Sequence, residues 1–222
     1  MNSYASVSDI NSRMISVYNN MFLAVVTSML VSLLVASSPS LMAVLFGTAL
    51  KWLVIFAPLV MIFAMTWIMQ RATQGQARAM LHVFAALMGL SMSTIFVVYT
   101  TTSIVTAFMG AAILFGTMSI YGYFTKKSLE SWGSFLFVGL IAVVITSIVN
   151  LFIGSSTLAM VVSAVAIIVF LGLTAYDTQR IRTDLSVYEP DSKAEVLGAL
   201  SLYLNFINLF MSLLQLFGNR DD

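Results

Sequence analysis

The segment LGALSLYLNFINLFMSLLQLF, residues 197–217, carries one row of polar side chains along an otherwise apolar stretch. The row consists of Ser201, Asn205, Asn208, Ser212 and Gln215. Its members are alternately four and three residues apart, so on an α-helix they share one face. Amides and hydroxyls are costly in hydrocarbon, and this face is therefore expected to contact protein or water. Two interpretations stay open: hydrogen bonding between helices, or the lining of a polar cavity.

The composition of the whole chain is that of an integral membrane protein. Its 222 residues are 60% hydrophobic and 9% charged, whereas a soluble domain has about 25% charged residues. The balance of 10 basic and 9 acidic residues gives no indication of a nucleic-acid partner. Without cysteine, and with His82 as the single histidine, the sequence offers no Cys- or His-based metal site. We therefore expect no cofactor.

Seven apolar segments each approach the ~20 residues that cross a bilayer. Their ranges are Ile15–Ala36, Trp52–Met69, Met80–Tyr99, Ile104–Phe124, Ser134–Ile153, Leu158–Tyr176 and Leu197–Phe217. Leu41–Leu50 is also apolar and is expected either to extend the second span or to lie in the membrane interface. The short connections predict an all-α fold in which residues 14–222 form a single seven-helix bundle after a cytoplasmic tail, residues 1–13.

The placement of basic residues predicts the orientation of the chain. Seven of the 10 basic residues fall in alternate connections: Arg71, Arg78, Lys126, Lys127, Arg180, Arg182 and Lys193. The positive-inside rule then puts the N-terminus in the cytoplasm and the C-terminus outside. We expect a multi-pass protein of a bacterial inner membrane.

The motifs of the common enzyme classes are missing from the sequence. No P-loop or dinucleotide fingerprint is present. Intramembrane aspartyl proteolysis needs two carboxylates, and the predicted spans hold no second acid to accompany Asp177. A serine nucleophile elbow is also lacking around Ser91. We therefore expect a protein that is not an enzyme.

Asp177 is the residue with the clearest functional potential. It follows the uncharged stretch Leu158–Tyr176 and precedes Arg180 and Arg182. One interpretation is a weak surface ion pair with Arg180. The other places Asp177 in a cavity that faces the polar row, where carboxylate and amide oxygens suit a hard cation such as Ca²⁺.

An acidic cluster lies close by in the sequence. Its members are Asp184, Glu189, Asp191 and Glu195. A solvated face is the simpler interpretation of this cluster, and an increase of the local cation concentration at a cavity mouth is the other.

Two motifs resemble the signatures of the Bax inhibitor-1 family, above all its bacterial YccA-like and YetJ-like branches. They are GLTAYDTQR at residues 172–180 and ALSLYLNFINLF at residues 199–210. The resemblance implies six helices around a central seventh, with the N-terminus inside and the C-terminus outside. For some members it also implies a pH-sensitive calcium leak, gated by two aspartates that share a proton.

This sequence departs from the family pattern at one of these two positions. Asp177 matches the first aspartate, but Asn205 stands at the second. An amide cannot share that proton, so our hypothesis is a gate with one carboxylate, whose pH response is shallower and shifted to lower pH. The resemblance further implies an arginine near the second helix as a gating partner, for which Arg71 is the nearest candidate; Arg180 is a second possible partner.

The leading functional prediction is a slow leak of Ca²⁺ or another cation across the lipid bilayer. The alternative is a modulator or slow substrate of a membrane-bound AAA protease, a role known in the YccA-like branch. That role would use the N-terminal tail and the lipid-facing surfaces. A proton-coupled transporter is a third possibility, but the sequence lacks the broken helices and matched half-repeats typical of that class.

Overall fold

The computed structural model describes residues 7–69, 71–188 and 193–219, and in these ranges the regular elements are nine helices with no strand. In chain order they are α1 (Val7–Ala36), α2 (Pro39–Gly47), α3 (Leu50–Ile68), α4 (Gln74–Met92), α5 (Ile95–Val98), α6 (Thr101–Phe124), α7 (Glu130–Ile153), α8 (Ser156–Val187) and α9 (Ala194–Phe217). The predicted all-α fold is confirmed.

Six of the helical segments are long and apolar enough to cross a membrane, and the bent pair α2–α3 raises the number to seven if the pair forms one span. The bend between α2 and α3 is 81°. Ser38 caps the start of α2 and Pro39 occupies its first position, which favours a new helix after α1. Thr48 has an extended backbone, so α2 ends before α3 begins. The apolar stretch Leu41–Leu50 therefore forms mainly a separate short helix.

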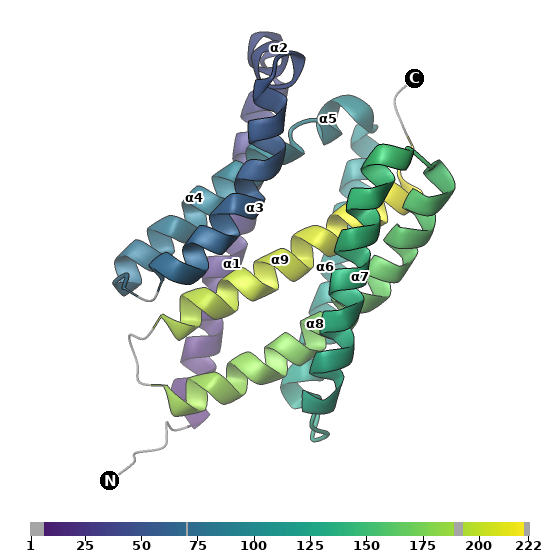
Figure 1. Cartoon of the computed structure of the whole chain (residues 1–222). Coiled ribbons are helices and arrows are strands. Elements are labelled where there is room, and N and C mark those ends of the chain that lie inside the picture. Colours follow the sequence, from purple (N-terminus) through teal and green to yellow (C-terminus); the bar gives the residue numbers. More distant parts are fainter. Residues whose placement is uncertain (1–6, 70, 189–192, 220–222) are drawn as a thin grey trace.

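The helix α9 is the most buried of the spanning helices. Of the residues in its most apolar 18-residue window, 72% are buried, compared with 11% for α7. It packs against α8, α1, α6 and α4, and Figure 1 shows it crossing the middle of the bundle. This burial agrees with the cost of exposing its polar row to hydrocarbon.

Two helices extend beyond the ranges expected from hydropathy. The first begins at Val7, so residues 7–13 of the expected N-terminal tail are helical, and residues 1–6 lie outside the described ranges. Asp9 in the first turn stabilises this helix start through the helix dipole. The helix α8 continues to Val187, and this places Asp177 inside the helix, ten residues before its last.

Glycine allows α6 and α8 to approach each other next to Asp177. A Cβ atom on Gly122 of α6 would lie 2.3 Å from the backbone oxygen of Ala175 in α8. Only a residue without a side chain fits this contact. This contact holds α6 against α8 at Ala175, two residues before Asp177.

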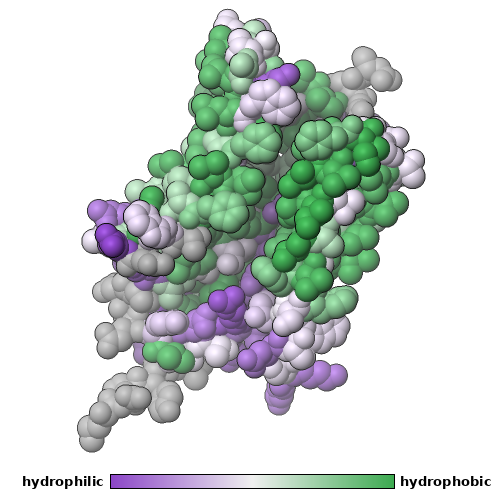
Figure 2. Space-filling model, viewed as in Figure 1, coloured by the Kyte–Doolittle hydropathy of each residue, from purple (hydrophilic) through white to green (hydrophobic). Residues whose placement is uncertain are grey.

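The outer surface is apolar, and the charged groups gather mostly at one end. Figure 2 shows a hydrophobic surface over α3 and α7, with hydrophilic residues concentrated toward the end where the chain begins. At this end Arg182 Nη1 donates to the Tyr123 backbone oxygen at 2.8 Å, and the Lys193 ammonium donates to the Met69 oxygen. These contacts join the ends of α6 and α8, and those of α3 and α9.

Candidate functional site: an acid–amide pair beside a polar cavity

Asp177 and Asn205 lie in direct contact across the interface of α8 and α9. Asn205 Nδ2 donates a hydrogen bond of 2.7 Å to Asp177 Oδ2. The Asn205 side chain is buried and Asp177 is half-buried. The structure thus brings together the two residues that the sequence singled out.

A cavity of about 370 Å³ opens beside this pair, between the later turns of α8 and the first turns of α9. It is lined by Asp177, Arg180, Ile181, Asp184, Tyr188, Lys193, Ala194, Leu197, Gly198 and Ser201. Both carboxylates and both cations among these residues come from the charged end of the bundle. The cavity thus places charged groups of both signs close to Asp177.

Arg180 forms its ion pair with Asp184, one helical turn further along α8. Arg180 Nε and Asp184 Oδ2 are 3.7 Å apart, and both side chains are exposed. An exposed pair of this kind contributes about 0.3–0.5 kcal/mol. Asp184, a member of the predicted acidic cluster, lines the cavity and is also exposed to solvent, so it fits both interpretations of the cluster.

The polar row of α9 divides into two parts. Ser201 lines the cavity and Asn205 bonds to Asp177. Gln215 Oε1 accepts a hydrogen bond of 2.9 Å from Ser163 Oγ of α8. Of the two interpretations of the row, cavity lining therefore applies to Ser201, and hydrogen bonding between helices applies to Gln215.

Two further members of the row satisfy their polar atoms within α9 itself. Asn208 Nδ2 donates to the Leu204 oxygen at 2.8 Å, and Ser212 Oγ donates to the Asn208 oxygen at 2.7 Å. These local bonds reduce the cost of placing an amide and a hydroxyl at membrane depth.

Arg71 occupies a different place from Asp177. Its guanidinium lies 5.8 Å from the centroid of the Trp67 ring. It also borders a separate cavity that is lined by residues of α3, α4 and their connection, Gln76 and Met80 among them. The structure does not bring this expected gating partner to the cavity of Asp177.

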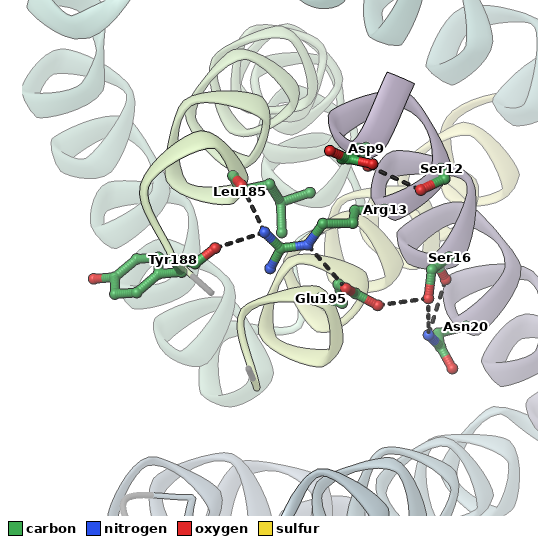
Figure 3. Close-up of polar contacts among 8 residues, drawn as sticks. All are labelled: Asp9, Ser12, Arg13, Ser16, Asn20, Leu185, Tyr188 and Glu195. Carbon is green, nitrogen blue, oxygen red and sulfur yellow. Dashed lines mark hydrogen bonds and ion pairs between the residues drawn. The ribbon is translucent and has the colours of Figure 1, made fainter. Parts of the chain in front are cut away.

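A buried ion pair that the sequence analysis missed links α1 to the start of α9 (Figure 3). Arg13 Nε and Glu195 Oε1 are 3.1 Å apart, and the two side chains are 7% and 9% exposed. Of the two interpretations of the acidic cluster, the solvated face is wrong for Glu195, because this residue is buried. Glu189 and Asp191 lie outside the described residues.

Hydrogen bonds complete the surroundings of this ion pair. Arg13 Nη1 donates to the backbone oxygens of Leu185 and Tyr188, each at 2.6 Å. Ser16 Oγ donates to Glu195 Oε2 at 2.7 Å. Buried charges require such partners.

A signal for this cluster was present in the sequence. Arg13, Ser16 and Asn20 are three and four residues apart, the same spacing as in the row of α9. Figure 3 shows the three side chains along one side of α1. The spacing indicates an inward polar face, although it does not identify Glu195 as the partner.

A second cavity, of about 350 Å³, lies between α6 and α9 at their other ends. Its lining includes Ser103, Thr106, Leu213 and Asn219. Between the two cavities the interface of α6 and α9 is packed with aromatic rings. Phe108 contacts Phe206 and Phe210 edge-on, with centroid distances of 5.4 and 6.0 Å, and Phe115 contacts Phe206 at 5.7 Å.

Together these features define a multi-pass helical membrane protein whose most buried helix pairs an amide with an acid beside a polar cavity. Residues 10–222 match the family model described as "Inhibitor of apoptosis-promoting Bax1". The chain therefore belongs to the Bax inhibitor-1 family, which confirms the resemblance seen in the two motifs.

Curated relatives match almost the whole chain. It is 38% identical over 213 residues to "Inner membrane protein YbhL" of Escherichia coli (strain K12), covering 93% of this chain and 91% of the relative. It is 38% identical over 212 residues to an uncharacterized protein of Rickettsia prowazekii, covering 94% and 90%. An uncharacterized protein of Caulobacter vibrioides is 36% identical over 224 residues, with 94% and 89% covered.

Proposed function

We propose that this protein is a slow leak for Ca²⁺ or a similar hard cation, with Asp177 as the ion-responsive group and Asn205 as its partner. The observation that carries the proposal is the 2.7 Å hydrogen bond between these side chains at the wall of a polar cavity. Acids at membrane depth are typical of ion and proton pathways. Carboxylate and amide oxygens are ligands that Ca²⁺ prefers.

The charges of the cavity suit a weak and passing interaction. Asp177 and Asp184 attract cations, while Arg180 and Lys193 offset much of that attraction. Passage toward the second cavity would require Asn205 to release Asp177 and the phenylalanine rings around Phe206 to separate. Because these contacts block the path in this conformation, we expect the flux of cations to be slow.

The chain is a multi-pass protein of the inner membrane, and its relative YbhL of Escherichia coli is named an inner membrane protein. We propose that the cavity of Asp177 opens to the cytoplasm and that the N-terminus lies on the same side. The support is the gathering of basic groups such as Arg182 and Lys193 at this end of the bundle.

The test is calcium flux into liposomes that contain the purified protein, measured from pH 5 to 8. Asp177→Asn keeps the shape of the side chain and removes its charge, so flux should fall at least tenfold. Asn205→Asp supplies a second carboxylate, so flux should depend more steeply on pH, with its transition at higher pH. Glu130→Gln is the matched control, because Glu130 is an exposed acid on α7; its flux should equal that of the wild type.

Equal flux in wild type and Asp177→Asn would reject the proposal, provided that both proteins are folded. The alternative role, as a modulator or slow substrate of a membrane-bound AAA protease, would then be tested. A deletion for that test should stop at residue 6, because α1 begins at Val7. A deletion through Ser12 would remove helical residues directly before Arg13.

A further inference from the structure

The end of α1 that carries Arg13 is bonded to three other helices. The ion pair and hydrogen bonds of Arg13 reach the start of α9 and the end of α8. Two residues earlier, Asn11 Oδ1 accepts a hydrogen bond from the Tyr123 hydroxyl of α6. The first turns of α1 therefore hold together helices that are distant in the sequence.

The groups that Arg13 binds belong to the wall of the Asp177 cavity or directly adjoin it. Tyr188 lines the cavity, and its backbone oxygen accepts from Arg13. Ala194 lines it on the side of α9, next to Glu195. One guanidinium thus holds the α8 side and the α9 side of the cavity at a fixed separation.

The distance between the α8 side and the α9 side of the cavity depends on the hydrogen bonds and the ion pair of Arg13. Its bonds are charge-assisted, and a planar guanidinium can satisfy several acceptors at once. With a neutral side chain in its place, Glu195 would remain as a buried and unpaired charge. The start of α9 could then reach a stable state only by exposing Glu195 to water, which would move the cavity wall.

We propose that Arg13 is a positioning residue that holds the α8 side and the α9 side of the Asp177 cavity together, so that displacement of the first turns of α1 widens the cavity mouth. The importance of this restraint for ion flux rests on the proposed function, whereas the restraint itself does not. The α1 helix would then be the element through which a change at the N-terminal end reaches Asp177.

The absence of cysteine from the chain allows a direct test. Ser201→Cys places a single thiol on the cavity lining, and its modification by a charged, membrane-impermeant thiosulfonate reagent reports access to the cavity. In liposomes, Arg13→Gln should raise the rate of modification at position 201 at least tenfold. Ser93→Cys is the matched control, because Ser93 is fully buried elsewhere in the bundle; its rate should stay low in both backgrounds.

Pairing is tested by removal of both charges. Arg13→Gln combined with Glu195→Gln leaves no unpaired buried charge, so the rate at position 201 should fall at least threefold below that of Arg13→Gln alone, and Arg13→Lys should give an intermediate rate. An unchanged rate in Arg13→Gln would overturn the proposal. A parallel rise at position 93 would also overturn it, because general loosening of the bundle would then be the cause. If Arg13→Gln exposes position 201 and no variant conducts calcium, the restraint by Arg13 stands and the cation leak is rejected.

Discussion

The Ser28 hydroxyl of α1 and the Tyr203 hydroxyl of α9 lie 2.6 Å apart in the buried interior. Ser28 Oγ also donates to the Ala85 oxygen of α4 at 2.7 Å, so in this arrangement the tyrosine hydroxyl is the donor to serine. Tyr203 is among the largest fully buried side chains. The contact joins the central helix to α1 and α4 at a single polar point.

Removal of one hydroxyl from this contact should destabilise the protein asymmetrically. Ser28→Ala leaves the buried Tyr203 hydroxyl unsatisfied, which should lower the free energy of unfolding by about 1–3 kcal/mol. Tyr203→Phe leaves Ser28 its bond to Ala85 and should cost about 0.5–1.5 kcal/mol. Denaturant unfolding in detergent measures both. The double variant should lose less than the sum, and strict additivity would contradict a direct bond.

The acid–amide pair should contribute to stability as well as to function. Asn205→Ala removes the amide that donates a hydrogen bond to Asp177 Oδ2. We therefore expect the free energy of unfolding to fall by about 1–3 kcal/mol. Asn208→Ala removes only a bond to the backbone of its own helix and should cost clearly less. Thermal unfolding of the two variants side by side would make this comparison, and a larger loss in Asn208→Ala would speak against the pair.

Gly122 should tolerate no side chain. Gly122→Ala places a methyl group against the backbone of Ala175 and should cost about 1–3 kcal/mol because α6 and α8 must separate. Gly116→Ala in the same helix has nothing within 4 Å of the new Cβ, so it should be neutral or stabilising by up to about 1 kcal/mol. Equal stabilities of the two variants would show that the close approach of α6 and α8 is not required.

Substitutions in the two parts of the polar row should have different effects on calcium flux. Gln215→Leu breaks the bond to Ser163 at the end of α9 far from Asp177, so calcium flux and its pH profile should match the wild type. The accompanying loss of stability should be small, because Ser163 Oγ keeps its contact with the Ala159 oxygen at 2.9 Å. A flux as low as that of Asp177→Asn would instead assign Gln215 to the ion pathway.

Patterns within single segments predicted much of this structure. Hydropathy predicted the spanning helices, and the polar row of α9 predicted side chains that line a cavity or bond to another helix, as Ser201 and Asn205 do. An acid at the end of an apolar stretch, together with the polar row of the last helix, suggested a cavity at Asp177, and the structure has one beside this residue. Each of these inferences needed only local periodicity and the cost of polar groups in hydrocarbon.

Contacts between distant segments were not predictable in the same way. The partner of Arg13 lies 182 residues away, among acidic neighbours that resemble a solvated face. The end of α8 was also missed, since hydropathy falls after Tyr176 although residues such as Gln179 and Arg182 continue the helix. Loss of apolar character marks the exit from hydrocarbon, and a helix can continue well beyond it.

The burial of α9 also sets an order of events during biosynthesis. A chain grows from its N-terminus, so α1, α6 and α8 enter the bilayer before the helix that they surround exists. Until Glu195 emerges from the ribosome, the ion pair between Arg13 and Glu195 cannot form. The contacts of α9 with the earlier helices therefore form last, and a chain truncated before Ala194 would lack the partners that Asp177 and Ser28 find in α9.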